Sequence, residues 1–160
     1  MKRRPPPAMG DYLETARAGC FICEIVAGRA EHPHHLVYED EAAIAFLNRF
    51  PTVEGYTLVA PRGHREQVTG DFDPDEYLAL QAVIHRVGEA VRRAFGAERL
   101  YLLSLGSQQA NRHVHWHVVP CPPGLPFERQ QLSLLDWSDG ILDLSEDEMA
   151  AIAARIGAEL

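Results

Sequence analysis

The sequence predicts an α+β domain built around an antiparallel sheet, and three observations lead to this fold class. Short β-type runs follow one another across hairpin-length turns, which is typical of antiparallel pairing. Two stretches carry helix-capping signals, at residues 73–76 and 145–148. The chain has 160 residues, of which 46% are hydrophobic, and this is enough for one domain with a real core.

The first elements are short. Residues 1–12 carry charges and a run of prolines, which predicts a flexible lead-in, whereas residues 13–160 are expected to form a single domain. A short helix is expected over residues 20–27, with Gly28 at its C-terminal stop. The next segments predict three strands, separated by turn signals, at residues 36–39, 43–48 and 56–60.

The longest predicted helix follows Asp73, which can cap it. Pro74 suits the first helical position, and Glu76 stands three residues after the cap. Apolar residues then recur at helical spacing up to Gly96: Tyr77, Leu80, Ile84, Val87 and Val91. The remaining elements are two strands and a last helix, at residues 100–105, 112–119 and from 145 onward.

Composition limits the classes of partner. Fifteen basic against 23 acidic residues leave a net charge of −8, which argues against a nucleic-acid-binding surface but allows one small phosphorylated ligand. No run is long and apolar enough to span a bilayer, and the N-terminus lacks the apolar segment of a secretory signal. Three cysteines do not make a disulfide framework. We therefore expect a cytoplasmic protein without a membrane partner.

Three histidines alternate with apolar residues late in the sequence: His113, His115 and His117. On a strand they share one face, while the apolar residues between them share the other. Neighbours on that face lie ~7 Å apart and the outer pair ~13 Å apart, so one metal ion can bind two neighbours, but not all three unless the strand bends. The extended row suits an elongated ligand such as a phosphate chain, and a neutral histidine is a good nucleophile toward phosphorus.

This row resembles the signature of the histidine-triad (HIT) family of nucleotidyl hydrolases and transferases. The resemblance covers about residues 20–121 and includes four further segments, at residues 20–28, 37–40, 45–48 and 55–64. It implies a HIT-like fold, with a five-stranded antiparallel sheet, two principal helices and a two-fold dimer. Histidine rather than glutamine at position 117 favours the hydrolase branch of the family.

The resemblance implies a nucleotide phosphohydrolase or phosphoramidase that acts at the α-phosphate. His115 would attack phosphorus and form a nucleotidyl-histidine intermediate, His117 would aid the leaving group, and His113 would support the site. The alternatives are a dinucleoside polyphosphate hydrolase, a nucleotide-binding regulatory protein with little turnover, and a metal-dependent hydrolase with His113 and His115 as zinc ligands. The expected partners are a small-molecule nucleotide and a second copy of the chain in a homodimer.

Further residues match positions at which the family binds its nucleotide. Asn48 falls at the ribose-binding position, and Gln109 matches a glutamine before the triad. Ala110 replaces the usual hydroxyl residue there, so Asn111 is the expected substitute donor. At the positions that flank the base in the family, this sequence has three apolar residues: Phe21, Ile25 and Phe46. Packing in a hydrophobic core would explain these residues equally well.

A second constellation predicts a structural zinc ion. Cys20 and Cys23 stand three residues apart, so on a helix both thiols lie on one face, and such a pair with two histidines makes a tetrahedral zinc set. The resemblance identifies these histidines as His64 and His113. Four protein ligands leave no coordination position for water, so this zinc would have a structural role rather than a catalytic one. The alternative is a buried pair of inert thiols, and no organic cofactor is expected.

Overall fold

The computed structural model describes residues 1–31 and 33–160. At its centre is a five-stranded antiparallel sheet in the order β2-β3-β4-β6-β5, which confirms the predicted architecture. The strands of this sheet are β2 (Leu36–Glu39), β3 (Ala43–Leu47), β4 (Thr57–Pro61), β5 (Arg99–Ser104) and β6 (Trp116–Cys121).

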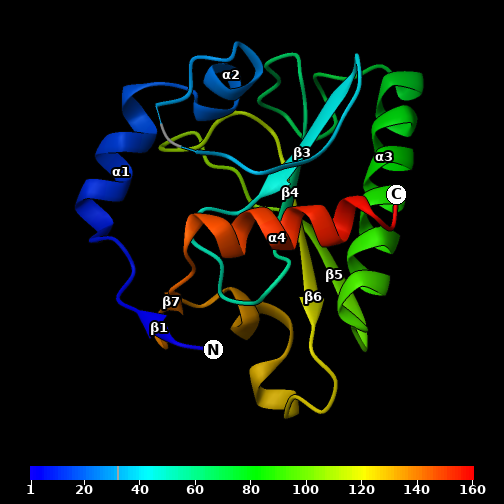
Figure 1. The fold of residues 1–160 in the computed structure, drawn as a ribbon. Coiled ribbons are helices and arrows are strands. Elements are labelled where there is room, and N and C mark those ends of the chain that lie inside the picture. The colour runs from blue at the N-terminus through cyan, green and yellow to red at the C-terminus, as the bar shows by residue number, and fades with distance from the viewer. Residues whose placement is uncertain (32) are drawn as a thin grey trace.

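Two helices cover one face of the sheet (Figure 1). The long helix α3 (Pro74–Phe95) packs on β3 to β6, and the C-terminal helix α4 (Glu146–Gly157) packs on β2, β3 and α3. Their buried side chains form one core with the sheet, including Ile84, Val91 and Ile152. These are the two principal helices that the sequence predicts.

The opposite face is covered by shorter segments. Helix α2 (Phe21–Val26) contributes Ile22, and a 3₁₀ segment (Gln131–Leu135) contributes Leu134, to a second core. Strand β3 is buried on both faces, because all five of its residues are buried and alternate ones belong to the two cores. The site described below lies on the α2 side of the sheet, so α2 is the element that positions part of it.

Helix α3 begins and ends as its sequence predicts. The Asp73 carboxylate accepts hydrogen bonds from the main-chain N–H groups of Asp75 and Glu76, and Glu76 completes a capping box. The helix ends at Gly96, whose φ of 57° lies in the left-handed region that glycine adopts without strain. Among the described residues, no helix combines the length and the apolarity needed to cross a membrane.

The N-terminal segment differs from the flexible lead-in expected over residues 1–12. Its β1 (Arg3–Arg4) pairs with β7 (Ile141–Leu142), and α1 (Met9–Ala18) begins before residue 12, along the left side in Figure 1. The Arg3 guanidinium also donates to the carbonyls of Gly140 and Thr52. The residues that pair with β1 and Arg3 lie far from them in the sequence, so no local sequence pattern predicts these contacts.

Candidate functional site

The histidine triad lies at the start of β6 and in the irregular segment before it. The strand predicted over residues 112–119 in fact begins at Trp116, because the Val114 N–H bonds to the Arg65 carbonyl at 2.7 Å instead of to a neighbouring strand. The alternation of faces still holds, since Val114, Trp116 and Val118 all pack into the core beneath α3. The histidines therefore face the α2 side.

His115 is held as a neutral imidazole with one nitrogen free. Its Nδ1 lies 2.7 Å from the main-chain carbonyl of His113, and a carbonyl only accepts, so Nδ1 carries the proton. The Nε2 atom therefore keeps a lone pair. Only 3% of the residue is exposed, and this burial lowers the pKa of His115 below its ordinary value. The ring of Phe21 lies edge-on to it.

His117 stands next to His115 on the same face, with ring centroids 4.9 Å apart. Burial and the neighbouring His115 lower the pKa of His117 to about 3, so this ring is neutral at physiological pH. Its Nδ1 lies 2.6 Å from the hydroxyl of Tyr56, at the entrance to β4. The sequence did not single out Tyr56, because nothing in its spacing distinguishes it from a core aromatic residue.

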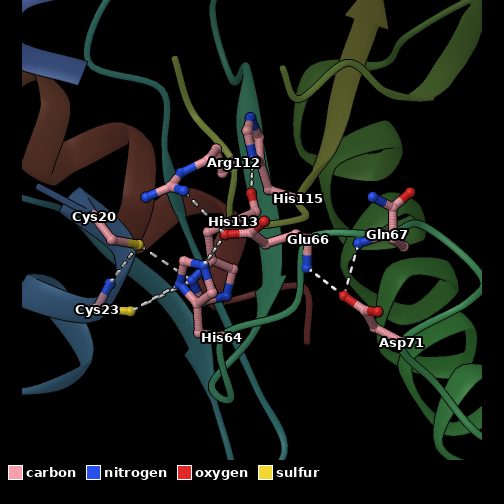
Figure 2. Close-up of polar contacts among 9 residues, drawn as sticks. All are labelled: Cys20, Cys23, His64, Glu66, Gln67, Asp71, Arg112, His113 and His115. Atoms are coloured by element: carbon pink, nitrogen blue, oxygen red, sulfur yellow. Dashed lines mark hydrogen bonds and ion pairs between the residues drawn. The ribbon is translucent and has the colours of Figure 1, made fainter. Parts of the chain in front are cut away.

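His113 turns away from the other two histidines. Its Nε2–H donates to the Pro61 carbonyl at 2.9 Å, which leaves the Nδ1 lone pair 3.3 Å from the Cys20 sulfur and 3.6 Å from the Cys23 sulfur. Burial lowers its pKa to about 4, so the ring stays neutral. Figure 2 shows His113 pointing toward the cysteines and His64, with His115 pointing away.

Cys20, Cys23, His64 and His113 form a four-residue cluster whose candidate ligand atoms all lie within 4.8 Å of one another. Tetrahedral zinc with bonds of about 2.3 Å to sulfur and about 2.0–2.1 Å to nitrogen holds such ligands about 3.6 Å apart. Three of the sulfur–nitrogen distances in the cluster are 3.3, 3.4 and 3.6 Å. The donor set and its spacing therefore fit zinc.

The two cysteines reach the cluster from the start of α2. Cys20 is the N-cap residue of the helix rather than part of it, and its sulfur accepts the Cys23 N–H at 3.4 Å. Burial, followed by the interaction with Cys20, raises the pKa of the Cys23 thiol to about 11. Without a cation this thiol keeps its proton, and a bound metal ion would displace it.

An acidic loop orients His64 within the cluster (Figure 2). The Nε2 of His64 donates to Glu66 at 3.2 Å, so its Nδ1 lone pair faces the Cys23 sulfur at 3.4 Å. Arg112 lies 3.7 Å from the same carboxylate oxygen, and Asp71 accepts the Glu66 N–H at 2.7 Å. A carboxylate behind a ligating histidine is the usual outer partner of a metal site. The sequence prediction did not include Glu66.

Of the three residues expected to flank the base, Phe21 lies edge-on to His115, and all three pack in or against the second core. Phe21 and Phe46 meet edge-on at 6.1 Å between ring centroids, and Phe46 is only 3% exposed. Ile25 packs against the same core from α2. The Asn48 Oδ1 accepts the Phe50 N–H at 2.8 Å, so half of its amide is already bonded within the protein.

Gln109 and Asn111 line a cavity of about 180 Å³ beside the four-residue cluster. The Gln109 carbonyl accepts a hydrogen bond from Arg17 of α1 at 2.8 Å, and the Asn111 amide donates to the Tyr12 hydroxyl at 2.6 Å. Both residues are therefore tied to α1. The sequence placed neither Arg17 nor Tyr12 near the site, because α1 reaches this loop only in the folded chain.

Comparison with known proteins decides the family. The family model of the HIT domain matches residues 29–123, which include His64 and all three triad histidines. The chain belongs to the HIT family. The fold and the family resemblance predicted from the triad are thus confirmed.

One relative and two solved structures illustrate the similarity to other HIT proteins. An uncharacterized HIT-like protein of Saccharolobus solfataricus is 34% identical over 104 residues, which cover 63% of this chain and 73% of the relative. A hypothetical histidine triad nucleotide-binding protein from Sulfolobus tokodaii superposes with a TM-score of 0.70 at 26% identity, covering 88% of this chain and 91% of its own. A zinc-bound HIT family protein from Mycobacterium smegmatis gives 0.66 at 25% identity, covering 89% and 93%.

Within this HIT domain, the triad is divided between two environments. His115 and His117 form a neutral pair beside apolar side chains, with an unprotonated Nε2 on His115. His113 instead joins the cysteines and His64 through its Nδ1 atom. The main chain couples the two environments, because the His113 carbonyl accepts the His115 proton. The arrangement can hold a nucleophile and a metal ion side by side.

Proposed function

We propose that this HIT-domain protein hydrolyses nucleotide derivatives at the α-phosphate through a covalent intermediate on His115. The observation that carries the proposal is the hydrogen bond from His115 Nδ1–H to the His113 carbonyl. It leaves the Nε2 lone pair as the reactive atom, and burial keeps the ring neutral by lowering its pKa. Membership of the HIT family supports the same reaction class.

The proposed reaction has two displacement steps. In the first, His115 Nε2 forms a bond to the α-phosphorus, and the leaving group departs with the electron pair of its own bond. His117 stabilises the charge that develops on the leaving atom by a hydrogen bond. In the second, water attacks phosphorus and the electron pair of the P–Nε2 bond returns to His115. The proton that water loses balances the one that the leaving group gains.

Trapping the intermediate tests this proposal. The wild-type protein, quenched during turnover of an AMP phosphoramidate, should carry one added nucleotidyl mass on the peptide that contains His115. His115→Ala should bind AMP without forming the adduct, whereas His85→Ala, at an exposed position on α3, should react like wild type. An adduct that persists in His115→Ala would refute the assignment.

The substrate class separates the remaining hypotheses. Faster turnover of diadenosine polyphosphates than of AMP phosphoramidates would favour the dinucleoside polyphosphate hydrolase. Tight AMP binding with no turnover of either would favour a regulatory protein. A catalytic zinc on His113 and His115 is disfavoured, because His115 Nδ1 is bonded to the main chain while His113 Nδ1 faces the sulfurs.

We also propose that Cys20, Cys23, His64 and His113 hold a structural zinc ion. The distances within the cluster and the carboxylate of Glu66 behind His64 support the proposal. The zinc-bound HIT protein of Mycobacterium smegmatis, with 25% identity, supports it further. Such an ion would tie α2 to the segment that precedes β6, and so hold Phe21 near His115.

The two-fold dimer and the cytoplasmic location stay predictions. Strand β5 lies at one edge of the sheet, and Leu102 on it is 49% exposed. Light scattering of the purified protein measures the mass in solution, and a value near 17.9 kDa, that of one chain, would contradict the dimer.

A further inference from the structure

We propose that Tyr56, oriented by Asn48, fixes His117 in the tautomer that carries its proton on Nε2. Tyr56 is then a positioning residue for the leaving-group side of the reaction. The catalytic consequence rests on the proposed function, whereas the tautomer itself does not. The HIT resemblance did not assign any role to Tyr56.

Three adjacent strands bring the groups together. Asn48 follows β3, Tyr56 precedes β4 and His117 lies on β6, opposite Leu58 of β4. The Asn48 N–H bonds to the Tyr56 carbonyl at 2.8 Å, which holds these two residues in register. Tyr56 is 4% exposed, and its hydroxyl lies 2.6 Å from His117 Nδ1.

The direction of the Tyr56–His117 hydrogen bond follows from the partners of Asn48. The Asn48 Oδ1 already accepts the Phe50 N–H, whereas the NH₂ group of the same amide only donates, so we assign the NH₂ group to Tyr56. A side-chain hydrogen bond from Asn48 acts to lower the pKa of Tyr56, as donation to the phenolic oxygen does. Burial outweighs this effect and raises the pKa of Tyr56, so the phenol keeps its proton.

The phenolic proton therefore points to His117. An amide NH₂ group does not accept a hydrogen bond, so His117 Nδ1 is the acceptor that the contacts provide for the Tyr56 O–H. A neutral imidazole that accepts at Nδ1 carries its single proton on Nε2. The His117 ring lies 4.9 Å from the His115 ring, so its Nε2–H is a donor beside the nucleophile. The other tautomer would present a lone pair there and repel a leaving atom that gains charge.

Tyr56→Phe removes the hydroxyl and keeps the ring, and Tyr101→Phe is the matched control. Tyr101 is partly buried on β5 of the same sheet, and its hydroxyl bonds to Gln130 at 3.2 Å, away from the triad. Nitrogen-15 NMR of histidine-labelled protein should show the His117 proton on Nε2 in wild type and in Tyr101→Phe. In Tyr56→Phe the fixed Nε2–H signal should be lost. A wild-type proton on Nδ1 would overturn the proposal outright.

The rates of hydrolysis of two AMP esters test the effect of Tyr56 on leaving-group departure. The phenyl ester has a poor leaving group that needs stabilisation, whereas the 4-nitrophenyl ester has a good one. Tyr56→Phe should slow the phenyl ester about 10-fold, the loss that one hydrogen bond between neutral groups can carry, and leave the 4-nitrophenyl ester within about twofold. Equal losses on both esters would mean that Tyr56 only supports the structure.

The two proposals can fail separately. If wild-type protein forms no His115 adduct with either ester, the proposed function fails, while the NMR measurement still decides the tautomer. If the adduct forms but Tyr56→Phe leaves both the His117 proton and the phenyl ester rate unchanged, the positioning role of Tyr56 fails and the proposed function stands.

Discussion

Removal of one ligand from the four-residue cluster should abolish stabilisation by zinc. Cys20→Ala eliminates a sulfur that lies 3.3 Å from His113 Nδ1 and also caps α2. The four residues come from the start of α2 and its N-cap, the loop after β4 and the segment before β6, which lie far apart in the sequence. An ion held by all four therefore binds the folded chain much more tightly than the unfolded chain.

The magnitude follows from linkage between binding and folding. Free zinc at about 100 times its dissociation constant raises the free energy of unfolding by about 2.7 kcal/mol. For a domain of this size, each kcal/mol raises the melting temperature by about 2–4 °C, so zinc should raise it by about 5–11 °C. Cys20→Ala should show little or none of this increase.

Differential scanning calorimetry with metal analysis measures both quantities. Cys121→Ala is the matched control, because Cys121 is the third cysteine, is fully buried and lies outside the cluster. This variant can melt at a lower temperature through lost packing, yet it should keep one zinc per chain and the full zinc-induced increase. The reasoning is refuted if Cys20→Ala binds zinc as well as wild type, or if chelated and reloaded wild type takes up none.

The affinity for zinc should also depend on pH. Zinc displaces the proton of Cys23, whose pKa is raised to about 11, so this thiol alone should increase the affinity about tenfold per pH unit over about pH 6–8. His113, with its pKa lowered to about 4, is already neutral there and adds no dependence. An affinity that does not change with pH in titrations with a competing chelator would contradict the predicted protonation of Cys23.

Two further predictions concern stability. Gly55 has a φ of 79°, and a Cβ there would lie 2.4 Å from the Phe95 ring. Gly55→Ala should therefore lower the free energy of unfolding by about 2–5 kcal/mol in urea titrations, whereas Gly63→Ala, in open space, should change it by less than about 0.5 kcal/mol. His117 has an ordinary pKa of 6.5 and a folded-state pKa of about 3, so the unfolded chain binds its proton first as the pH falls. Stability should decline below pH 6.5, and His117→Asn should make that decline shallower.

The urea dependence of unfolding and the pH dependence of stability provide the controls for these two predictions. For Gly55→Ala, an unchanged dependence on urea concentration together with a lower midpoint indicates a loss of stability rather than a change in the unfolded state. For His117, equal acid sensitivity in wild type and His117→Asn would show that this ring is charged in the folded protein, contrary to its burial beside His115.

Much of the fold was predictable, because it depends on local patterns. The capping box at Asp73 and the glycine at the end of α3 are each recognisable from a few neighbouring residues. The alternation of Val114, Trp116 and Val118 also determines which face of the segment enters the core beneath α3. The convergence of four ligand residues was predictable only through resemblance to a family, because spacing alone pairs no more than Cys20 with Cys23.

The sequence by itself therefore determined the strands of the central sheet, the helices α2, α3 and α4, and the face to which the three histidines belong. Only the tertiary structure decided what each imidazole does. In the folded chain His113 bonds to the Pro61 carbonyl and points toward the cysteines. His115 Nδ1–H donates to the His113 carbonyl, and the Tyr56 hydroxyl lies within hydrogen-bond distance of His117. The physical reason is that the tautomer and pKa of a buried ring depend on hydrogen-bond partners and burial. Pro61 and Tyr56 lie more than 50 residues from their histidines in the sequence.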